Sequence, residues 1–269
     1  MPTSAFWRAA MHELNVVIAL AGRDLLKFFR DPGRMIAAGI FPFVTIFLLG
    51  GTLQLNLGKA AGFNFIGFTF TGFLGMTLFQ STAQGLTSLM DDRQNDFAQE
   101  MFVSPVSRYS IVFGKILGET LVAVMQVVPM VVFAAILRVP LTATALALLV
   151  PVALLSCFMG GSFGLLLLNT MSDSRASNQI FNFVFLPQYF LAGLISPINN
   201  LPWYLEVLSL ASPMRYVIDL ARGVVFAGSR DYERVVLLNP VTNVAVLALM
   251  LAVFLVLGTT LFVRRETNR

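Results

Sequence analysis

The stretch Asp91–Glu119, which reads DDRQNDFAQEMFVSPVSRYSIVFGKILGE, is a polar island between two long, apolar, Phe-rich runs. The whole 269-residue chain is 57% hydrophobic and 12% charged, with a mean hydropathy of +0.79, whereas soluble domains carry about 25% charged residues. Because the apolar runs are continuous rather than alternating, they favour helices over barrel strands. The chain is therefore expected to be an all-α integral membrane protein with a single transmembrane domain over residues 1–269.

The apolar runs predict six transmembrane helices that form one bundle over residues 35–263. Their expected ranges are 35–54, 65–89, 111–137, 143–168, 180–195 and 241–263. Each except the fifth is long enough to cross about 30 Å of hydrocarbon. With both termini on the cytoplasmic side of the inner membrane, twelve of the 18 Lys and Arg residues lie inside and six outside, which satisfies the positive-inside rule. Lys115 and Glu119 fall in the first turns of the third span, where long side chains are expected to snorkel to the interface.

The first thirty residues predict a separate amphipathic helix over residues 5–31 that lies in the plane of the lipid headgroups. Its apolar stripe comprises Trp7, Met11, Leu14, Ile18, Leu25 and Phe29, and its opposite face carries Arg23, Lys27, Arg30 and Arg34. Pro32 disfavours helical geometry at Asp31, so the helix is expected to end there. A cleaved signal peptide is the alternative, but its apolar core, residues 14–21, would be short and would follow an acidic Glu13.

The polar island itself predicts a short surface helix over residues 94–103. Two i,i+4 pairs, one acidic and one apolar, give this helix an apolar tip beside a charged flank. The residues of this pattern are Asp96, Phe97, Glu100, Met101 and Phe102, and Arg108 follows at the membrane surface. A solvated loop is the alternative, although such a loop would not need to expose three large apolar side chains. The pattern therefore favours contact with a soluble partner.

A second insert, residues 196–228, follows the short fifth span on the outer side of the predicted bundle. A Ser-Pro step divides it into two helices too short to cross a bilayer, so a re-entrant hairpin buried against the spans is expected. Arg215, Asp219 and Arg222 share a face at i, i+4 and i+7 and are expected to neutralise one another. With Trp203 they are candidates for an outer lid over a translocation path, and a folded loop with a surface salt bridge is the alternative.

Aromatic and mildly polar side chains of the first, second and fifth spans are candidates for a substrate path. Flat aromatic walls suit hydrophobic ligands, and Gly67, Gly72 and Gly75 allow the second span to approach its neighbours closely. The candidates are Phe41, Phe68, Phe73, Thr77, Gln80, Phe183, Phe185 and Tyr189. Each phenylalanine also has a simpler interpretation as a lipid-facing or packing residue.

Three stretches, in this order, resemble the membrane subunits of ABC exporters of the type-2 permease class, in the branch of daunorubicin-resistance-like drug and lipid exporters. They are Phe29–Pro42 (FRDPGRMIAAGIFP), Glu100–Lys115 (EMFVSPVSRYSIVFGK) and Leu186–Arg222. The resemblance covers nearly the whole chain. It implies the permease of an ATP-driven exporter, which moves a hydrophobic small molecule, drug or lipid-like substrate by alternating access.

The resemblance also implies partners. It makes residues 5–31 a connecting helix, 94–103 a coupling helix and 196–228 a pair of outer re-entrant helices, in a homodimer or heterodimer that docks on two ABC ATPase subunits. The residues expected to contact the ATPase are Arg23, Lys27, Arg30, Asp96, Phe97, Glu100, Met101, Phe102 and Arg108. The chain has no G-x-x-x-x-G-K-[ST] phosphate loop, because Gly114-Lys115 lacks both the upstream glycine and the following Ser or Thr. ATP and magnesium are therefore expected on the ATPase, and no cofactor on this chain.

Other functions fit the sequence less well. A membrane enzyme would need a nucleophile–base or metal constellation, but the chain has one His and one Cys and no H-E-x-x-H or G-x-S-x-G motif. No carboxylate or lysine pair is expected at mid-bilayer, which argues against an ion-coupled carrier. The basic residues collect on one membrane side, so no nucleic acid is expected as a partner. A polysaccharide or glycolipid exporter permease, and an ATPase-docked membrane protein with a regulatory role, stay open as alternatives.

Overall fold

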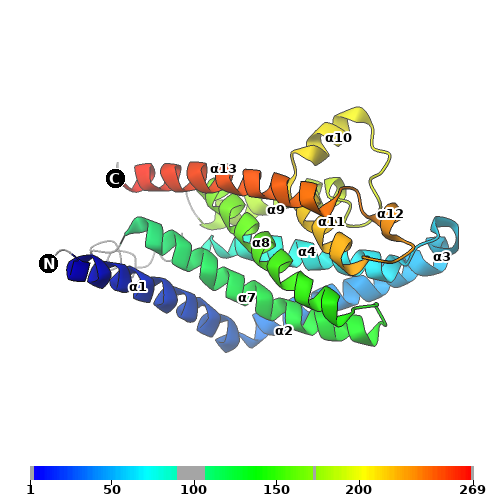
Figure 1. The fold of residues 1–269 in the computed structure, drawn as a ribbon, viewed down its shortest axis with the longest axis horizontal. Coiled ribbons are helices and arrows are strands. Elements are labelled where there is room, and N and C mark those ends of the chain that lie inside the picture. Colours follow the sequence, from blue (N-terminus) through cyan, green and yellow to red (C-terminus); the bar gives the residue numbers. More distant parts are fainter. Residues whose placement is uncertain (1–2, 90–106, 172–173, 268–269) are drawn as a thin grey trace.

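In the computed structural model, which describes residues 3–89, 107–171 and 174–267, every regular element is helical. The elements are α1 (Thr3–Arg30), α2 (Pro32–Thr45), the π-helical turn η1 (Ile46–Gly50), α3 (Gly51–Ala61), α4 (Phe65–Gly85), α7 (Arg108–Ile136), α8 (Ala143–Leu168), α9 (Ser174–Leu191), α10 (Trp203–Leu210), α11 (Pro213–Val225), α12 (Tyr232–Val235) and α13 (Pro240–Thr267). The two ends of the described chain lie at one end of the elongated molecule, and α3, α10 and α12 lie toward the other (Figure 1).

Four segments of the described chain are long and apolar enough to cross a membrane. They are Pro32–Ala61, Tyr109–Ile136, Ala143–Leu168 and Tyr232–Arg264. They correspond to the first, third, fourth and sixth predicted spans and confirm an all-helical membrane protein. The second and fifth predicted spans are present as α4 and α9. The six-span arrangement stays a prediction, because α4 is diluted by Thr, Gln and Gly and the first turns of α9 are polar.

The N-terminal helix ends where the sequence predicts. Asp31 leaves the helical region (φ −108°, ψ 88°) and caps α2 by accepting a hydrogen bond from the Arg34 amide at 2.9 Å. Arg34 therefore belongs to α2, and its prediction as part of the basic face of the first helix was wrong. The side chains of the predicted apolar stripe that are strongly exposed are Met11, Leu14, Ile18 and Phe29. This exposed stripe suits a helix that lies on the headgroups, which stays a prediction.

α4 is the central helix of the described bundle and contacts α7, α8 and α11. Two glycines of α8 make close approach possible, because a Cβ on Gly160 or Gly164 would overlap the backbone of α4. On another side of α4, a Cβ on Gly75 would lie 3.1 Å from Ile218 Cα of α11. Helices that approach this closely gain dispersion contacts that larger residues would prevent. The position of α4 between its neighbours is therefore tightly defined.

The outer insert contains two short helices, α10 and α11, on either side of Ser212. Asp219 of α11 is 1% exposed and accepts hydrogen bonds from the Leu237 amide at 2.7 Å, the Leu238 amide at 2.9 Å and Asn243 Nδ2 at 2.8 Å. This carboxylate therefore fixes the chain just before α13 and the first turn of α13 itself, and so attaches α13 to α11.

The two arginines of α11 have partners other than Asp219. Arg215 donates to Glu206 at 2.9 Å and to Ser209 at 2.8 Å, both on α10. Arg222 donates to the Gly193 carbonyl at 2.6 Å, and its guanidinium carbon lies 3.7 Å from the ring centroid of Phe68. Among the described residues no ion pair within 4.0 Å joins the three charges, although Arg222 lies within electrostatic reach of Asp219, so their mutual neutralisation stays a prediction. They share a helix face as predicted, but each side chain reaches a different neighbouring segment.

We expect Asp219→Ala to destabilise the protein by about 2–4 kcal/mol, because two backbone amides lose their acceptor in a buried site. Thermal unfolding of the detergent-solubilised chain measures the loss. Glu233→Ala is the matched control, since Glu233 is an exposed carboxylate in the same outer region. Equal, small effects of the two substitutions would contradict the role assigned to Asp219.

Candidate functional site

An open cavity of about 520 Å³ lies between α1, α2, α4 and α7, and we call it the α2–α4 cavity. α2 lines it with one face, at helical spacing: Arg34, Ala37, Ala38, Phe41 and Pro42. α4 contributes a more polar face: Met76, Thr77, Gln80, Ser81, Gln84, Gly85, Thr87 and Ser88 belong to it or to the turn that follows. The volume falls within the range of about 300–1,000 Å³ that is usual for small-molecule sites.

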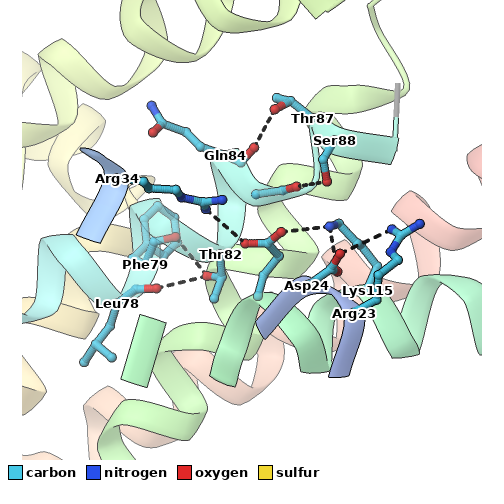
Figure 2. Close-up of polar contacts among 12 residues, drawn as sticks. Arg23, Asp24, Arg34, Leu78, Phe79, Thr82, Gln84, Thr87, Ser88 and Lys115 are labelled. Atoms are coloured by element: carbon cyan, nitrogen blue, oxygen red, sulfur yellow. Dashed lines mark hydrogen bonds and ion pairs between the residues drawn. The ribbon is translucent and has the colours of Figure 1, made fainter. Parts of the chain in front are cut away.

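One end of the α2–α4 cavity is lined by three buried charges, Asp24, Lys115 and Glu119, which we call the Lys115 cluster. Lys115 Nζ of α7 donates to Asp24 Oδ2 of α1 at 2.7 Å and to Glu119 Oε1 at 2.8 Å (Figure 2). Arg34 of α2 approaches Glu119 Oε2 at 3.6 Å. Lys115 is only 2% exposed, so the prediction that it snorkels to the interface was wrong. The two carboxylates hold the ammonium inside the protein, and each charge compensates the desolvation of the others.

Glycines bring the helices of this cluster together. A Cβ on Gly118 of α7 would lie 2.9 Å from Asp24 Oδ2, and one on Gly114 would lie 3.1 Å from Val17 Cα of α1. A Cβ on Gly85, the last residue of α4, would overlap the carboxylate of Glu119. The charges therefore lie where α7 packs closely against α1 and against the end of α4.

A second polar contact joins α1 to the start of α7. Glu13 accepts a hydrogen bond from the amide of Ser107, the capping residue of α7, at 3.1 Å. Hydrogen bonds from the Ser110 side chain and the Ser107 amide hold the pKa of Glu13 below its ordinary value. α1 is thus attached to α7 at two levels, by Glu13 and by the Lys115 cluster.

The structure brings together part of the predicted substrate path. Phe41, Thr77 and Gln80 line the α2–α4 cavity, and Tyr189 donates its hydroxyl to Gln80 Oε1 at 2.8 Å. The other four candidates do not line this cavity. Phe68, Phe73 and Phe185 are buried in the helical core, and Phe183 is 79% exposed on the outside of the chain.

The predicted ATPase contacts lie partly outside the described residues. This applies to the coupling helix, residues 94–103, with Asp96, Phe97, Glu100, Met101 and Phe102, and to the side chain of Arg108. On α1, Lys27 and Arg30 are exposed, whereas Arg23 is partly buried and lies 3.2 Å from Asp24. Of the predicted lid residues, Trp203 is exposed on α10, and Arg215, Asp219 and Arg222 are buried.

Sequence reasoning missed Asp24 and the partnership of Lys115 with it. Two signals were available. Asp24 is an acidic residue next to an otherwise basic helix face, and Gly114 and Gly118 have the G-x-x-x-G spacing of closely packed membrane helices. Together they indicate that a second helix covers the start of the third span, where a buried lysine would need a carboxylate.

Comparisons with known proteins agree with this architecture. A family model described as "ABC-2 type transporter" matches residues 15–226. The putative transport permease ycf38 of Cyanophora paradoxa is 23% identical over 214 residues, 78% of this chain and 73% of the relative. Its counterpart in Porphyra purpurea is 26% identical over 211 residues, 77% and 72% of the two chains. The probable multidrug ABC transporter permease YbhR of Escherichia coli is 24% identical over 137 residues, 50% of this chain and 37% of the relative. The family match spans most of an all-helical chain with membrane-crossing helices, and this chain therefore belongs to the ABC-2 type transporter family.

Proposed function

We propose that this chain is the permease subunit of an ATP-driven exporter, which moves a hydrophobic small molecule, drug or lipid-like substrate across the cytoplasmic membrane by alternating access. The observation that carries this proposal is the α2–α4 cavity, because it combines an apolar wall with amide and hydroxyl groups inside a membrane-spanning protein. The name of YbhR, a multidrug permease, points to the same class of substrate.

The driving force would come from two copies of a separate ABC ATPase, which bind two permease chains in a homodimer or heterodimer. α1 would serve as the connecting helix and residues 94–103 as the coupling helix, with both termini in the cytoplasm. The Lys115 cluster supports this arrangement, since it attaches α1 to α7 and also lines the cavity. A push on α1 would therefore reach the wall of the cavity without an intervening flexible segment.

The outer insert would act as a lid at the far end of the path. α10 and α11 lie away from the chain ends (Figure 1), which suits a gate on the outer side. Within the lid, Arg215 would hold α11 to α10, and the buried hydrogen bonds of Asp219 and Arg222 would hold α11 to the start of α13 and to Gly193 just after α9. Its re-entrant placement in the bilayer is part of the proposal.

Two other functions are compatible with membership of the ABC-2 type transporter family: export of a polysaccharide or glycolipid, and regulation of an ATPase without transport. A polysaccharide or glycolipid exporter would need a path for sugars, whereas the α2 wall of the cavity is largely Ala, Phe and Pro. An ATPase-docked regulator would need no substrate site. The polarity of the α2–α4 cavity favours a small amphipathic substrate over both.

The proposal is tested by copurification with the ATPase encoded nearest to this chain, followed by ATP turnover in lipid. We expect a stable complex, and we expect Phe97→Asp with Met101→Asp to abolish it while membrane insertion is retained. Ser229→Asp with Arg230→Asp, at two exposed positions between α11 and α12, is the control and should leave the complex intact.

Two results would contradict these expectations. Unchanged copurification of the double variant would remove the coupling-helix assignment. A wild-type chain that binds no ATPase under any nucleotide condition would transfer support to the regulatory alternative.

The Lys115 cluster gives a second prediction. Lys115→Met leaves Asp24 and Glu119 as buried carboxylates without their shared ammonium, so we expect a loss of about 3–5 kcal/mol in thermal unfolding. The neutral triple variant Asp24→Asn, Lys115→Met, Glu119→Gln should recover most of this stability, because no fully buried charge is left without a partner. Arg23 and Arg34 lose their carboxylates, but their side chains are 22% and 43% exposed and can be solvated.

The triple variant also separates folding from coupling. If the cluster transmits movement from α1 to α7, the refolded variant should still bind the ATPase but should transport less substrate for each ATP hydrolysed. Wild-type transport by the triple variant would show that the cluster only stabilises the fold.

A further inference from the structure

The α2–α4 cavity changes polarity from one end to the other. The continuous segment α2–η1 runs antiparallel to α4. At the first end, Gly50 of η1 lies against Ile66 at the start of α4. At the second end, Arg34 at the start of α2 approaches Glu119, which packs on Gly85 at the end of α4. Asp24, Arg34, Lys115 and Glu119, which line the cavity and are joined by ion pairs, lie at the second end. Phe41, Pro42 and Met76 lie toward the first. Such a cavity fits a molecule with an ionised headgroup and an apolar body.

The charges of the lining favour an anionic headgroup. Among the described lining residues three are cations and two are carboxylates. Both carboxylates are engaged by Lys115 at 2.7 and 2.8 Å, and Asp24 has a further ion pair with Arg23 at 3.2 Å. Lys115 and Arg23 therefore match the two negative charges inside the protein, and the Arg34 guanidinium is a further positive charge at this end of the cavity.

Arg34 is the residue best placed to bind such a headgroup. Its side chain is 43% exposed, its Nη2 atom lies 3.6 Å from Glu119 Oε2, and its guanidinium carbon lies 5.8 Å from the ring centroid of Phe28. Within the described part of the chain no hydrogen bond from this guanidinium is formed, although the group has five N–H donors. A guanidinium binds phosphate and carboxylate oxygens with two parallel hydrogen bonds.

A cationic headgroup fits this end less well. The acceptor for such a headgroup would be Glu119 Oε2, which has no hydrogen-bond partner, but this oxygen is buried. To reach it, the cation would have to displace Arg34 and lie beside Lys115. Repulsion between like charges would oppose that position.

We propose that the α2–α4 cavity binds an anionic amphiphile, with its phosphate or carboxylate at Arg34 and its apolar chain along Phe41 and Met76. This inference rests on the proposed transport function and names the chemical class of its substrate. Lys115 has a supporting part, because its bond to Glu119 compensates the carboxylate nearest to Arg34.

The experiment uses the full chain in nanodiscs of zwitterionic lipid. Three fluorescent probes with the same alkyl chain end in a phosphate, a trimethylammonium or a hydroxyl group, and their affinities are measured by equilibrium titration. We expect the phosphate probe to bind at least about tenfold more tightly than the other two, since a charge-assisted hydrogen bond is worth a factor of this order.

Variants locate the site. Arg34→Gln should remove the preference for the phosphate probe and Arg34→Lys should restore part of it, whereas Arg230→Gln, at an exposed arginine of the outer region, should change nothing. Ala38→Phe should weaken all three probes, because it fills the apolar part of the cavity. Equal affinity for the three headgroups, or a preference for the cationic probe that Glu119→Gln abolishes, would overturn the inference.

The inference and the proposed function can fail separately. If the chain forms an active complex with its ATPase but shows no preference for the phosphate probe, the exporter proposal stands and the substrate class is wrong. If the preference is present and depends on Arg34 but no ATPase binds, the cavity is an anionic-amphiphile site in a protein that is not an exporter.

Discussion

The ammonium group of Lys115, held between the carboxylates of Asp24 and Glu119, is the contact on which the packing of α1 against α7, and with it one end of the α2–α4 cavity, depends. A buried lysine without partners would cost several kcal/mol of desolvation, so α1 has to cover the start of α7 for the fold to form. Gly114 and Gly118 permit that approach, and Gly85 makes room for Glu119 beside α4. One cluster thus fixes the N-terminal helix, the third predicted span and the end of the central helix.

The α2–α4 cavity follows from this geometry. Arg34 lies in the first turn of a new helix because Asp31 ends α1 and caps α2, and this turn directs α2 along α4 instead of continuing the line of α1. The cluster then lines the end of the space between α2 and α4. A movement of α1 would change this end first, which connects the part of the chain proposed to contact an ATPase with the part proposed to bind the substrate.

Much of the fold could be predicted from the sequence, because long apolar runs and Pro or Gly steps act locally. The break at Asp31, the four membrane-crossing helices and the two short helices around Ser212 are of this kind. The pairing of the charges could not be predicted, since it depends on helices far apart in the chain. Spacing on one helix placed Arg215, Asp219 and Arg222 on a common face, but their partners lie on α10, before α13 and after α9. Likewise, composition could not separate Phe41, which lines the cavity, from Phe185, which is buried in the core.

The central claim is that the α2–α4 cavity changes its accessibility during the ATPase cycle. The most direct test places a cysteine at Thr77, inside the cavity, after replacement of the buried Cys157 by serine. Labelling by a charged thiol reagent from the cytoplasmic side is then followed in the assembled complex, with and without ATP and vanadate. The account predicts rapid labelling without nucleotide and much slower labelling in the trapped state. The same labelling rate in both states would contradict it.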